Sequence, residues 1–184
     1  MNKKVPLAVL AGVLVVAAAA AFGYSAGVAA VREQFGVRGW VQVTVVRDGK
    51  VIYYHEGHNV ITKQGKEFIA QQVGGQPDSG QYTQWIGLST YNPSNLDPDW
   101  TFIPNEITGG GLARAKGTYS YDSAQKKYSV TNTFQASASF SGVKLAGLYW
   151  NATGNSLFAA NTFSPAVDLI DGDYLTVTWT ITIS

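Results

Sequence analysis

The sequence contains no cysteine, so the chain can form neither disulfide bonds nor thiolate metal sites. Its single methionine is Met1, which leaves little side-chain sulfur that could be oxidised. The folded chain must therefore be held together by packing, hydrogen bonds, bound ions or partner molecules. With 184 residues, 46% of them hydrophobic, it is long enough to bury a full core, and we expect a single domain.

Charged residues are also scarce, at 14% of the chain, and the two signs are balanced: 13 residues are basic and 12 are acidic. A protein that binds nucleic acid normally carries a basic stripe or patch on its surface. No such excess is present here. We therefore expect no nucleic-acid partner.

Histidine is limited to His55 and His58, which are three residues apart in a stretch with the pattern of a strand and its turn. A zinc metalloprotease needs two histidines four residues apart on a helix, and an odd separation in a strand points two side chains to opposite faces. With two histidines and no cysteine, no nucleophile–base triad is apparent. The run 109–111 of three glycines precedes a predicted strand and lacks the Lys-Ser/Thr pair of a phosphate loop. We expect that this protein is not an enzyme.

The end of the chain has the clearest pattern. From Leu175 to Ile183 every second residue is apolar, and the even positions from Thr176 to Thr182 are all threonine. A period of two places the apolar side chains on one face of a strand and the hydroxyls on the other. Such a strand needs a second layer over its apolar face.

Residues 1–26 have the pattern of a secretory signal. Lys3 and Lys4 are followed by an uncharged, mostly apolar stretch and then by small residues. Cleavage after Ala21, Ser25 or Ala30 would satisfy the preference for small residues. The uncharged stretch is also long enough to remain as a membrane anchor helix, so the chain would meet a membrane only during export or if this helix is retained. We expect an extracellular or cell-surface location.

Residues 40–184 predict an all-β domain, a single β-sandwich or jelly roll of about eight strands with one short helix. Asp48-Gly49 indicates a hairpin turn after the strand that begins at Trp40. The helix is expected to begin after Thr62 as its N-cap, to bury Phe68 and Ile69, and to stop at Gly74-Gly75. The later strands are expected at residues 85–89, 112–121, 127–140, 143–150, 157–163 and in the final segment.

Two loops hold closely spaced carboxylates, the first with Asp97 and Asp99 and the second with Asp168, Asp171 and Asp173. Calcium prefers cages of hard oxygen ligands, so calcium is a possible cofactor at these five residues. Turn aspartates that bond their own backbone give the same pattern and are the more common case. Asn151-Ala152-Thr153 is the only glycosylation sequon, and Asn151 is therefore a candidate glycan site.

Residues 27–39 lie between the predicted signal and the domain. They are too apolar for a linker and too short for a domain. An extended segment of this kind can add to the open sheet edge of a neighbouring copy, with main-chain hydrogen bonds and alternating side-chain pockets. Head-to-tail insertion that does not close produces filaments. The candidate donor residues are Val28, Ala30, Val31, Phe35 and Val37; the alternative is that this segment packs on its own domain or remains a disordered stub.

Several short runs resemble a group of secreted archaeal filament subunits of the cannula, thread and bundling-pilus type. These runs are His58–Thr62, Gly65–Ala70, Trp85–Ser89, Gly111–Ala115, Ala146–Leu148 and Asp171–Trp179. The resemblance implies a jelly roll that polymerises by donor-strand complementation, with calcium at subunit contacts in the cannula branch. No donor motif matches residue by residue, so the donor residues above rest on the composition of the segment.

We therefore predict a structural subunit of an extracellular filament, with other copies of itself as partner and with possible contacts to other cells or filaments. One alternative is a carbohydrate-binding module, for which Tyr119, Tyr121 and Tyr128 are the candidate aromatic platform. A second alternative is a type IV pilin-like subunit assembled through an N-terminal helix. That pattern fits poorly, because Val5-Pro6 follows the basic segment and no glutamate lies just beyond it.

Overall fold

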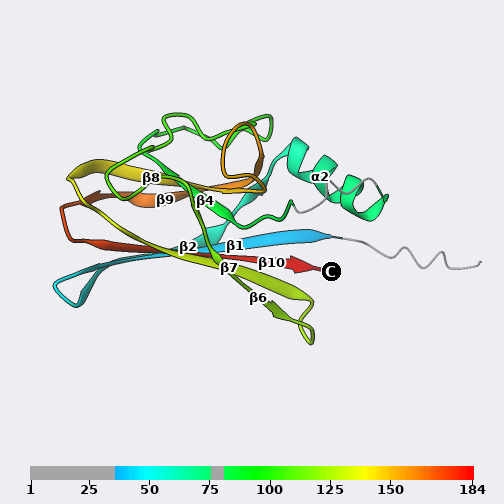
Figure 1. Cartoon of the computed structure of the whole chain (residues 1–184), viewed down its shortest axis with the longest axis horizontal. Helices are drawn as coiled ribbons and strands as arrows, with labels where there is room; N and C mark the ends of the chain where they lie inside the picture. Colours follow the sequence, from blue (N-terminus) through cyan, green and yellow to red (C-terminus); the bar gives the residue numbers. More distant parts are fainter. Residues whose placement is uncertain (1–35, 76–80) are drawn as a thin grey trace, which may run out of the picture. The chain divides into compact units, whose positions relative to one another are not determined.

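The structure, a computed structural model, describes residues 36–75 and 81–184 of the chain. These residues form a mostly β domain with one short helix (Figure 1). The predicted signal or anchor helix lies outside the described residues, as do the candidate donor residues Val28, Ala30, Val31 and Phe35. None of the helices in the described ranges has both the length and the hydropathy of a membrane span.

The strands form two antiparallel five-stranded sheets. Sheet A has the order β2-β1-β10-β7-β6. Its strands are β2 (Lys50–His58), β1 (Val37–Arg47), β10 (Tyr174–Ile183), β7 (Lys127–Gln135) and β6 (Thr118–Asp122). Sheet B has the order β3-β9-β8-β4-β5. Its strands are β3 (Val60–Ile61), β9 (Leu157–Leu169), β8 (Phe140–Tyr149), β4 (Trp85–Ser89) and β5 (Ala115–Lys116).

Buried residues of the two sheets form the main hydrophobic core, as in an all-β sandwich, and a second, smaller cluster contains Ile103, Tyr149, Leu157 and Ala160. In β10 the side chains of Leu175, Val177, Trp179 and Ile181 are at most 1% exposed. On the opposite face of this strand, the hydroxyl of Thr178 lies 3.0 Å from that of Thr131 on β7. The period of two in the final strand therefore predicts its two faces correctly.

The single described helix, α2 (Lys63–Val73), follows β3. Thr62 is its N-cap, and the hydroxyl of Thr62 accepts a hydrogen bond from the Gly65 N–H at 3.0 Å. Phe68 is buried and stacks on Trp150 with 4.7 Å between ring centroids. The helix ends at Gly74, whose N–H donates to the Ala70 carbonyl at 2.7 Å. The predicted start, the burial of Phe68 and the end of this helix are confirmed. Ile69, which was also expected to be buried, is only half-buried.

The predicted strand boundaries were wrong where the chain passes from one sheet to the other. Residues 112–121 do not form one strand, because the chain leaves sheet B after β5 and joins sheet A at β6, with Gly117 between them. Residues 127–140 are divided in the same way between β7 and β8. The first strand begins at Val37, three residues before the predicted start at Trp40.

Candidate functional site: the open end of the domain

The two termini of the described domain meet at one end of sheet A. Gly36 and Ser184 donate main-chain N–H groups to one another's carbonyl oxygens, and Val37 pairs with Ile183. Val37 and Ile183 lie on the inner face of sheet A, in line with the buried Val41 and Trp179. Ile183 is nevertheless 45% exposed. The inner face of the sheet is therefore incompletely covered at this end, which we call the open end.

Two hollows lie at the open end, one on each side of α2. The first, which we call the slot, has a volume of about 810 Å³ and is bounded by the start of β1, the end of β2, β3 and α2. The second, which we call the tyrosine hollow, has a volume of about 560 Å³ and lies between α2, the end of β10, β6–β7 and residues 81–84. Val37, Ile69 and Val73 line both hollows, so the two hollows share one apolar wall.

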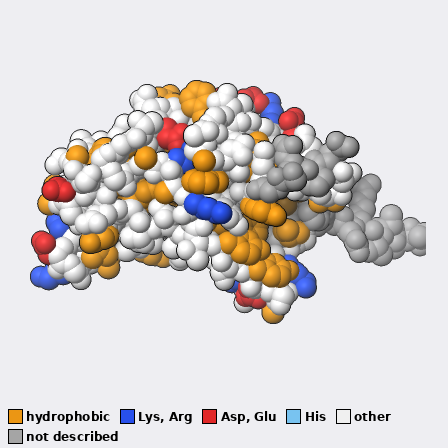
Figure 2. Space-filling model, in the orientation of Figure 1, with side chains coloured by type: hydrophobic (Ala, Val, Ile, Leu, Met, Phe, Trp, Pro, Cys, Tyr) orange, Lys and Arg blue, Asp and Glu red, His pale blue; other side chains and the backbone are white. Residues whose placement is uncertain are grey.

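The walls of these hollows are largely apolar and remain accessible. Val73 is 79% exposed and Tyr82 is 63% exposed, although both are large hydrophobic residues. In the orientation of Figure 1, Figure 2 shows hydrophobic side chains gathered beside the root of the β6–β7 hairpin. An exposed apolar surface of this kind on a folded domain commonly marks a site of interaction.

The tyrosines proposed as a carbohydrate platform divide into two kinds. Tyr119 and Tyr121 are 49% and 56% exposed on β6. Tyr128 faces the tyrosine hollow, its hydroxyl lies 2.6 Å from that of Thr83, and burial raises its pKa to about 12. The Tyr119 and Tyr128 rings are 5.8 Å apart and tilted by 30°. Tyr128 therefore packs beside Tyr119 on the same face of sheet A and is not itself a free platform.

The five candidate calcium ligands are not brought together. Asp97 accepts the Asp99 N–H at 2.9 Å, and Asp99 lies 2.6 Å from the Lys63 ammonium. Asp168 accepts hydrogen bonds from the Ser141 hydroxyl and the Gly142 N–H, and Asp171 is exposed in the turn after β9. In the two described ranges, no group of three His, Asp or Glu residues is placed so that it could hold a metal ion.

The Asp173 carboxylate forms an ion pair with Arg47. This carboxylate is 1% exposed and accepts from Arg47 Nε at 2.8 Å, from Arg47 Nη2 at 2.7 Å and from the Ile170 N–H at 2.9 Å. The hydrogen bonds from Arg47 hold the pKa of this carboxyl below its usual value of 3.8. Asp173 thus ties β10 to β1 at the end of the domain opposite to the open end.

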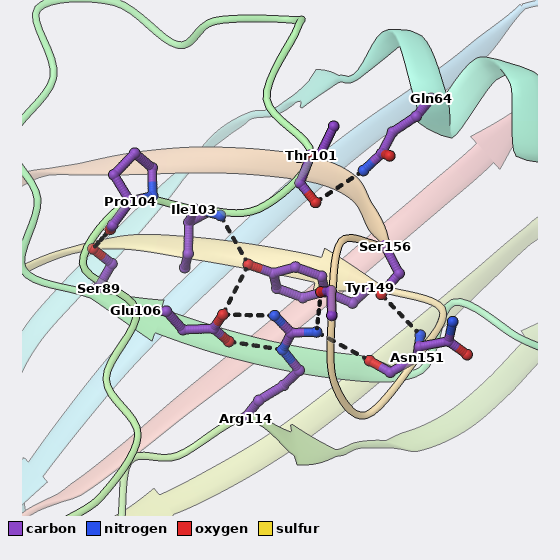
Figure 3. A network of polar contacts seen from close by, with 11 residues as sticks. Gln64, Ser89, Thr101, Ile103, Pro104, Glu106, Arg114, Tyr149, Asn151 and Ser156 are labelled. Carbon is purple, nitrogen blue, oxygen red and sulfur yellow. Dashed lines mark hydrogen bonds and ion pairs between the residues drawn. The ribbon is translucent and has the colours of Figure 1, made fainter.

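A second polar network fixes the segment before β5 to sheet B (Figure 3). Arg114 donates to both carboxylate oxygens of Glu106, at 2.7 and 2.6 Å, and its guanidinium carbon lies 3.5 Å from the centre of the Tyr149 ring. Burial raises the pKa of Tyr149, whose hydroxyl accepts the Ile103 N–H. Arg114 also donates to the carbonyls of Asn151 and Gly154. These groups satisfy one another, so we interpret the network as structural.

Asn151, the predicted glycan site, lies in the turn between β8 and β9 that Arg114 holds. Glycosylation of Asn151 stays a prediction.

His55 and His58 point to opposite faces of their strand. The centre of the His55 ring lies 6.0 Å from that of Phe163 on the inner side, whereas the His58 ring packs edge-on against Trp40. The structure therefore does not bring the two imidazoles together as a metal pair.

Sequence reasoning missed Asn59, Lys66 and Val73 as residues that line the slot, and it assigned Ile69 to the core alone. A signal was available, because Ile69 and Val73 are four residues apart and form a second apolar stripe on the helix beside Phe68. The last part of the predicted donor segment, residues 36–39, is in fact the beginning of the domain: Val37 is the first residue of β1 and pairs with Ile183 of its own chain.

We compared the chain with protein-family models, with curated proteins and with solved structures, and it matches none of them.

Proposed function

We propose that this protein is a structural subunit of an extracellular filament, in which the segment before Gly36 of one copy covers the open end of the next copy. The observation that supports this proposal is the uncovered apolar end of the sandwich, with its slot and tyrosine hollow at the point where residues 1–35 join the domain. An apolar segment is thus attached beside an apolar surface that its own described domain leaves accessible.

The energetics favour a covered open end. Burying a Val or Ile side chain fully is worth about 1.5–3 kcal/mol, and Val73 and Ile183 still expose much of their surface. Part of this gain offsets the loss of translational and rotational freedom on association. Because each copy has one segment and one open end, the contact is head-to-tail and repeats along a chain of copies.

Deletion of residues 27–35 tests the proposal. The deletion must stop at Phe35, because Gly36 and Val37 pair with Ser184 and Ile183 and their loss would damage sheet A. Electron microscopy of the secreted full-length protein is expected to show filaments. The deletion variant is expected to give soluble, folded monomers with the far-ultraviolet circular dichroism of a β domain.

A deletion variant that still forms filaments would refute the donor role of residues 27–35. The absence of filaments from the full-length protein under all conditions would refute the filament function itself. As a control, Lys50→Ala, on an exposed residue beside the β1–β2 turn at the other end of sheet A, is expected to leave assembly unchanged.

A carbohydrate-binding module is the second candidate, and one observation favours it. Tyr119 and Tyr121 both expose about half of their surface on the same face of β6, an arrangement that suits stacking on a sugar ring. Binding of the monomer to a glycan array, lost in Tyr119→Ala, would support this function. Tyr174→Ala is the matched control, because Tyr174 is 45% exposed on the outer face of sheet A.

Three finer features belong to the same proposal. The two sheets would follow the jelly-roll connectivity that the resemblance to archaeal filament subunits implies. Residues 1–26 would act as the secretory signal, and the alternative of assembly through a retained N-terminal helix would be detected by sequencing the N-terminus of the assembled protein. A mature N-terminus near residue 27 would fit the donor arrangement.

A further inference from the structure

At the slot, the first residues of β1 have no partner on β2, the neighbouring strand of sheet A. The ladder between β1 and β2 begins at Trp40 and His58, so Val37 and Arg38 have no partner on β2. Gly36 and Ser184 exchange both main-chain hydrogen bonds, and in an antiparallel ladder the next residue then directs its N–H and C=O to the opposite side. Val37 therefore points its main-chain groups away from β10, to the side where β2 has already ended.

Sheet B contributes a second edge to the same slot. β3 is the outermost strand of sheet B, and it pairs with β9 only through Val60 and Ile61. The Thr62 N–H donates to the Phe158 carbonyl on β9, so the same alternation turns the main-chain groups of Ile61 away from β9. Ile61 and Val37 both line the slot.

A polar side chain in the wall of the slot also has no partner. Both amide atoms of Asn59 are buried, and neither makes a hydrogen bond within the described part of the chain. The amide lies directly over Gly39, where any Cβ atom would overlap with it. A buried amide without partners costs about 1–3 kcal/mol, which an incoming main chain would recover once the Asn59 side chain turns into the slot.

The charges at the slot select its occupant. Arg38 and Lys66 line it and both are exposed, whereas no acidic residue of the described ranges lines it. Residues 27–35 contain one acidic residue, Glu33, and one basic residue, Arg32. Neighbouring residues of a strand point in opposite directions, so Glu33 can face the slot while Arg32 faces solvent. Nine extended residues span about 30 Å, which is enough to cross the slot.

We infer that the slot is the acceptor site for residues 27–35 of a second copy of this chain. This inference rests on the proposed filament function. It adds which surface of the acceptor copy is contacted and which charged residues pair across the contact. The segment continues the position of β2 alongside Val37, its main chain satisfies Asn59, its apolar side chains pack on Ile69 and Val73, and Glu33 pairs with Lys66.

Cysteine pairs test the place of the contact, and the absence of natural cysteine gives a clean background. Copies with Val31→Cys are mixed with copies with Ala70→Cys and oxidised during assembly. We expect a disulfide-linked dimer of the two kinds of copy. The control pair replaces Ala70→Cys by Ala124→Cys in the β6–β7 turn, away from the slot, and is expected to give no dimer.

Charge reversal tests the proposed ion pair between Glu33 of one copy and Lys66 of the next. Lys66→Glu and Glu33→Lys are each expected to raise the protein concentration needed for half-maximal assembly about fivefold, and the two together are expected to restore it. Lys116→Glu, on exposed β5, is the matched control and should have no effect. Circular dichroism of each variant checks that the fold is kept.

The outcomes separate the acceptor site from the filament function. Filaments that form without the cross-link and without any response to charge reversal would refute the slot but leave the filament function standing. A cross-link formed within one chain carrying both cysteines, in dilute monomer, would show that the segment folds onto its own domain and would overturn the inference. Cross-linking between copies together with charge rescue would support it.

Discussion

The two ends of sheet A are built in opposite ways. At the end where β1 turns into β2 and β9 into β10, which we call the sealed end, Asp173 is buried and bonded to Arg47 and to the Ile170 N–H. Asp168 accepts the Gly142 N–H beside it. At the open end, Val73 and Ile183 are exposed, and buried polar atoms of Asn59 and Gln81 have no partner in the described part of the chain.

The two ends therefore differ in how completely their apolar side chains and polar groups are covered and paired within the described domain. A surface that will always face water can be closed by turns and charge pairs, as at the sealed end. An apolar surface with unpaired main-chain edges costs free energy in an isolated monomer, because edges and buried polar groups need partners. The open end is therefore the part of the domain that a partner is expected to complete.

The largest effect is expected at the sealed end. Asp173→Asn removes the negative charge from a carboxylate that is 1% exposed and leaves the Arg47 guanidinium without its partner. We expect the free energy of unfolding of the monomer to fall by about 2–3 kcal/mol, measured by urea denaturation at neutral pH. Asp171→Asn in the same turn is exposed and should change it by less than about 0.5 kcal/mol. Equal effects of the two variants would contradict the buried pair.

The same variant makes a prediction about pH. Because Arg47 lowers the pKa of Asp173 below 3.8, the unfolded chain binds a proton at this carboxyl before the folded chain does as the pH falls. The stabilisation is therefore complete above about pH 3.8 and is lost as the pH falls through the lower pKa of the folded state. The difference in stability between the wild type and Asp173→Asn should shrink towards zero in that acid range and stay constant from pH 5 to about pH 7.

A matched pair of exposed apolar residues compares the two ends directly. Val73 is 79% exposed at the open end, and Ile170 is 46% exposed at the sealed end. Val73→Ser is expected to weaken assembly by about 1.5 kcal/mol, or about tenfold in the concentration for half-maximal assembly, because the proposed contact would bury this side chain. Ile170→Ser should leave assembly unchanged. Equal loss of assembly in both variants would mean that the open end is not the contact.

Much of the fold could be predicted because local patterns decide it. The alternation from Leu175 to Ile181, the positive φ of Gly49 in the Asp48-Gly49 turn and the capping of α2 by Thr62 all depend on residues close together in the sequence. The points where the chain changes sheets, such as Gly117, depend on partners far along the chain. A prediction from local sequence patterns therefore merged strands that belong to different sheets into one.

The site was harder to predict for a physical reason. An apolar residue such as Val73 looks the same in the sequence whether the rest of the domain covers it or leaves it exposed. Among the described residues, Val37 has no partner on the β2 side because β2 ends at His58, which pairs with Trp40, whereas β1 already begins at Val37. This register is a property of the folded sheet. The apolar character of residues 27–35 can be seen in the sequence, whereas the exposed apolar surface at the open end is a property of the folded domain.

The smallest loss of stability is expected from the unpaired amide. Asn59→Ala should not lower the free energy of unfolding of the monomer, because no hydrogen bond is lost and the cost of a buried amide without a partner is removed. Asn161→Ala is the matched control: the Asn161 side chain is 2% exposed and donates to the His58 carbonyl at 2.8 Å, so its loss should cost about 1–2 kcal/mol. Thermal unfolding of both variants measures the difference. If Asn59→Ala were as destabilising as Asn161→Ala, Asn59 would already have a partner within the monomer, and the open end would be as complete as the sealed one.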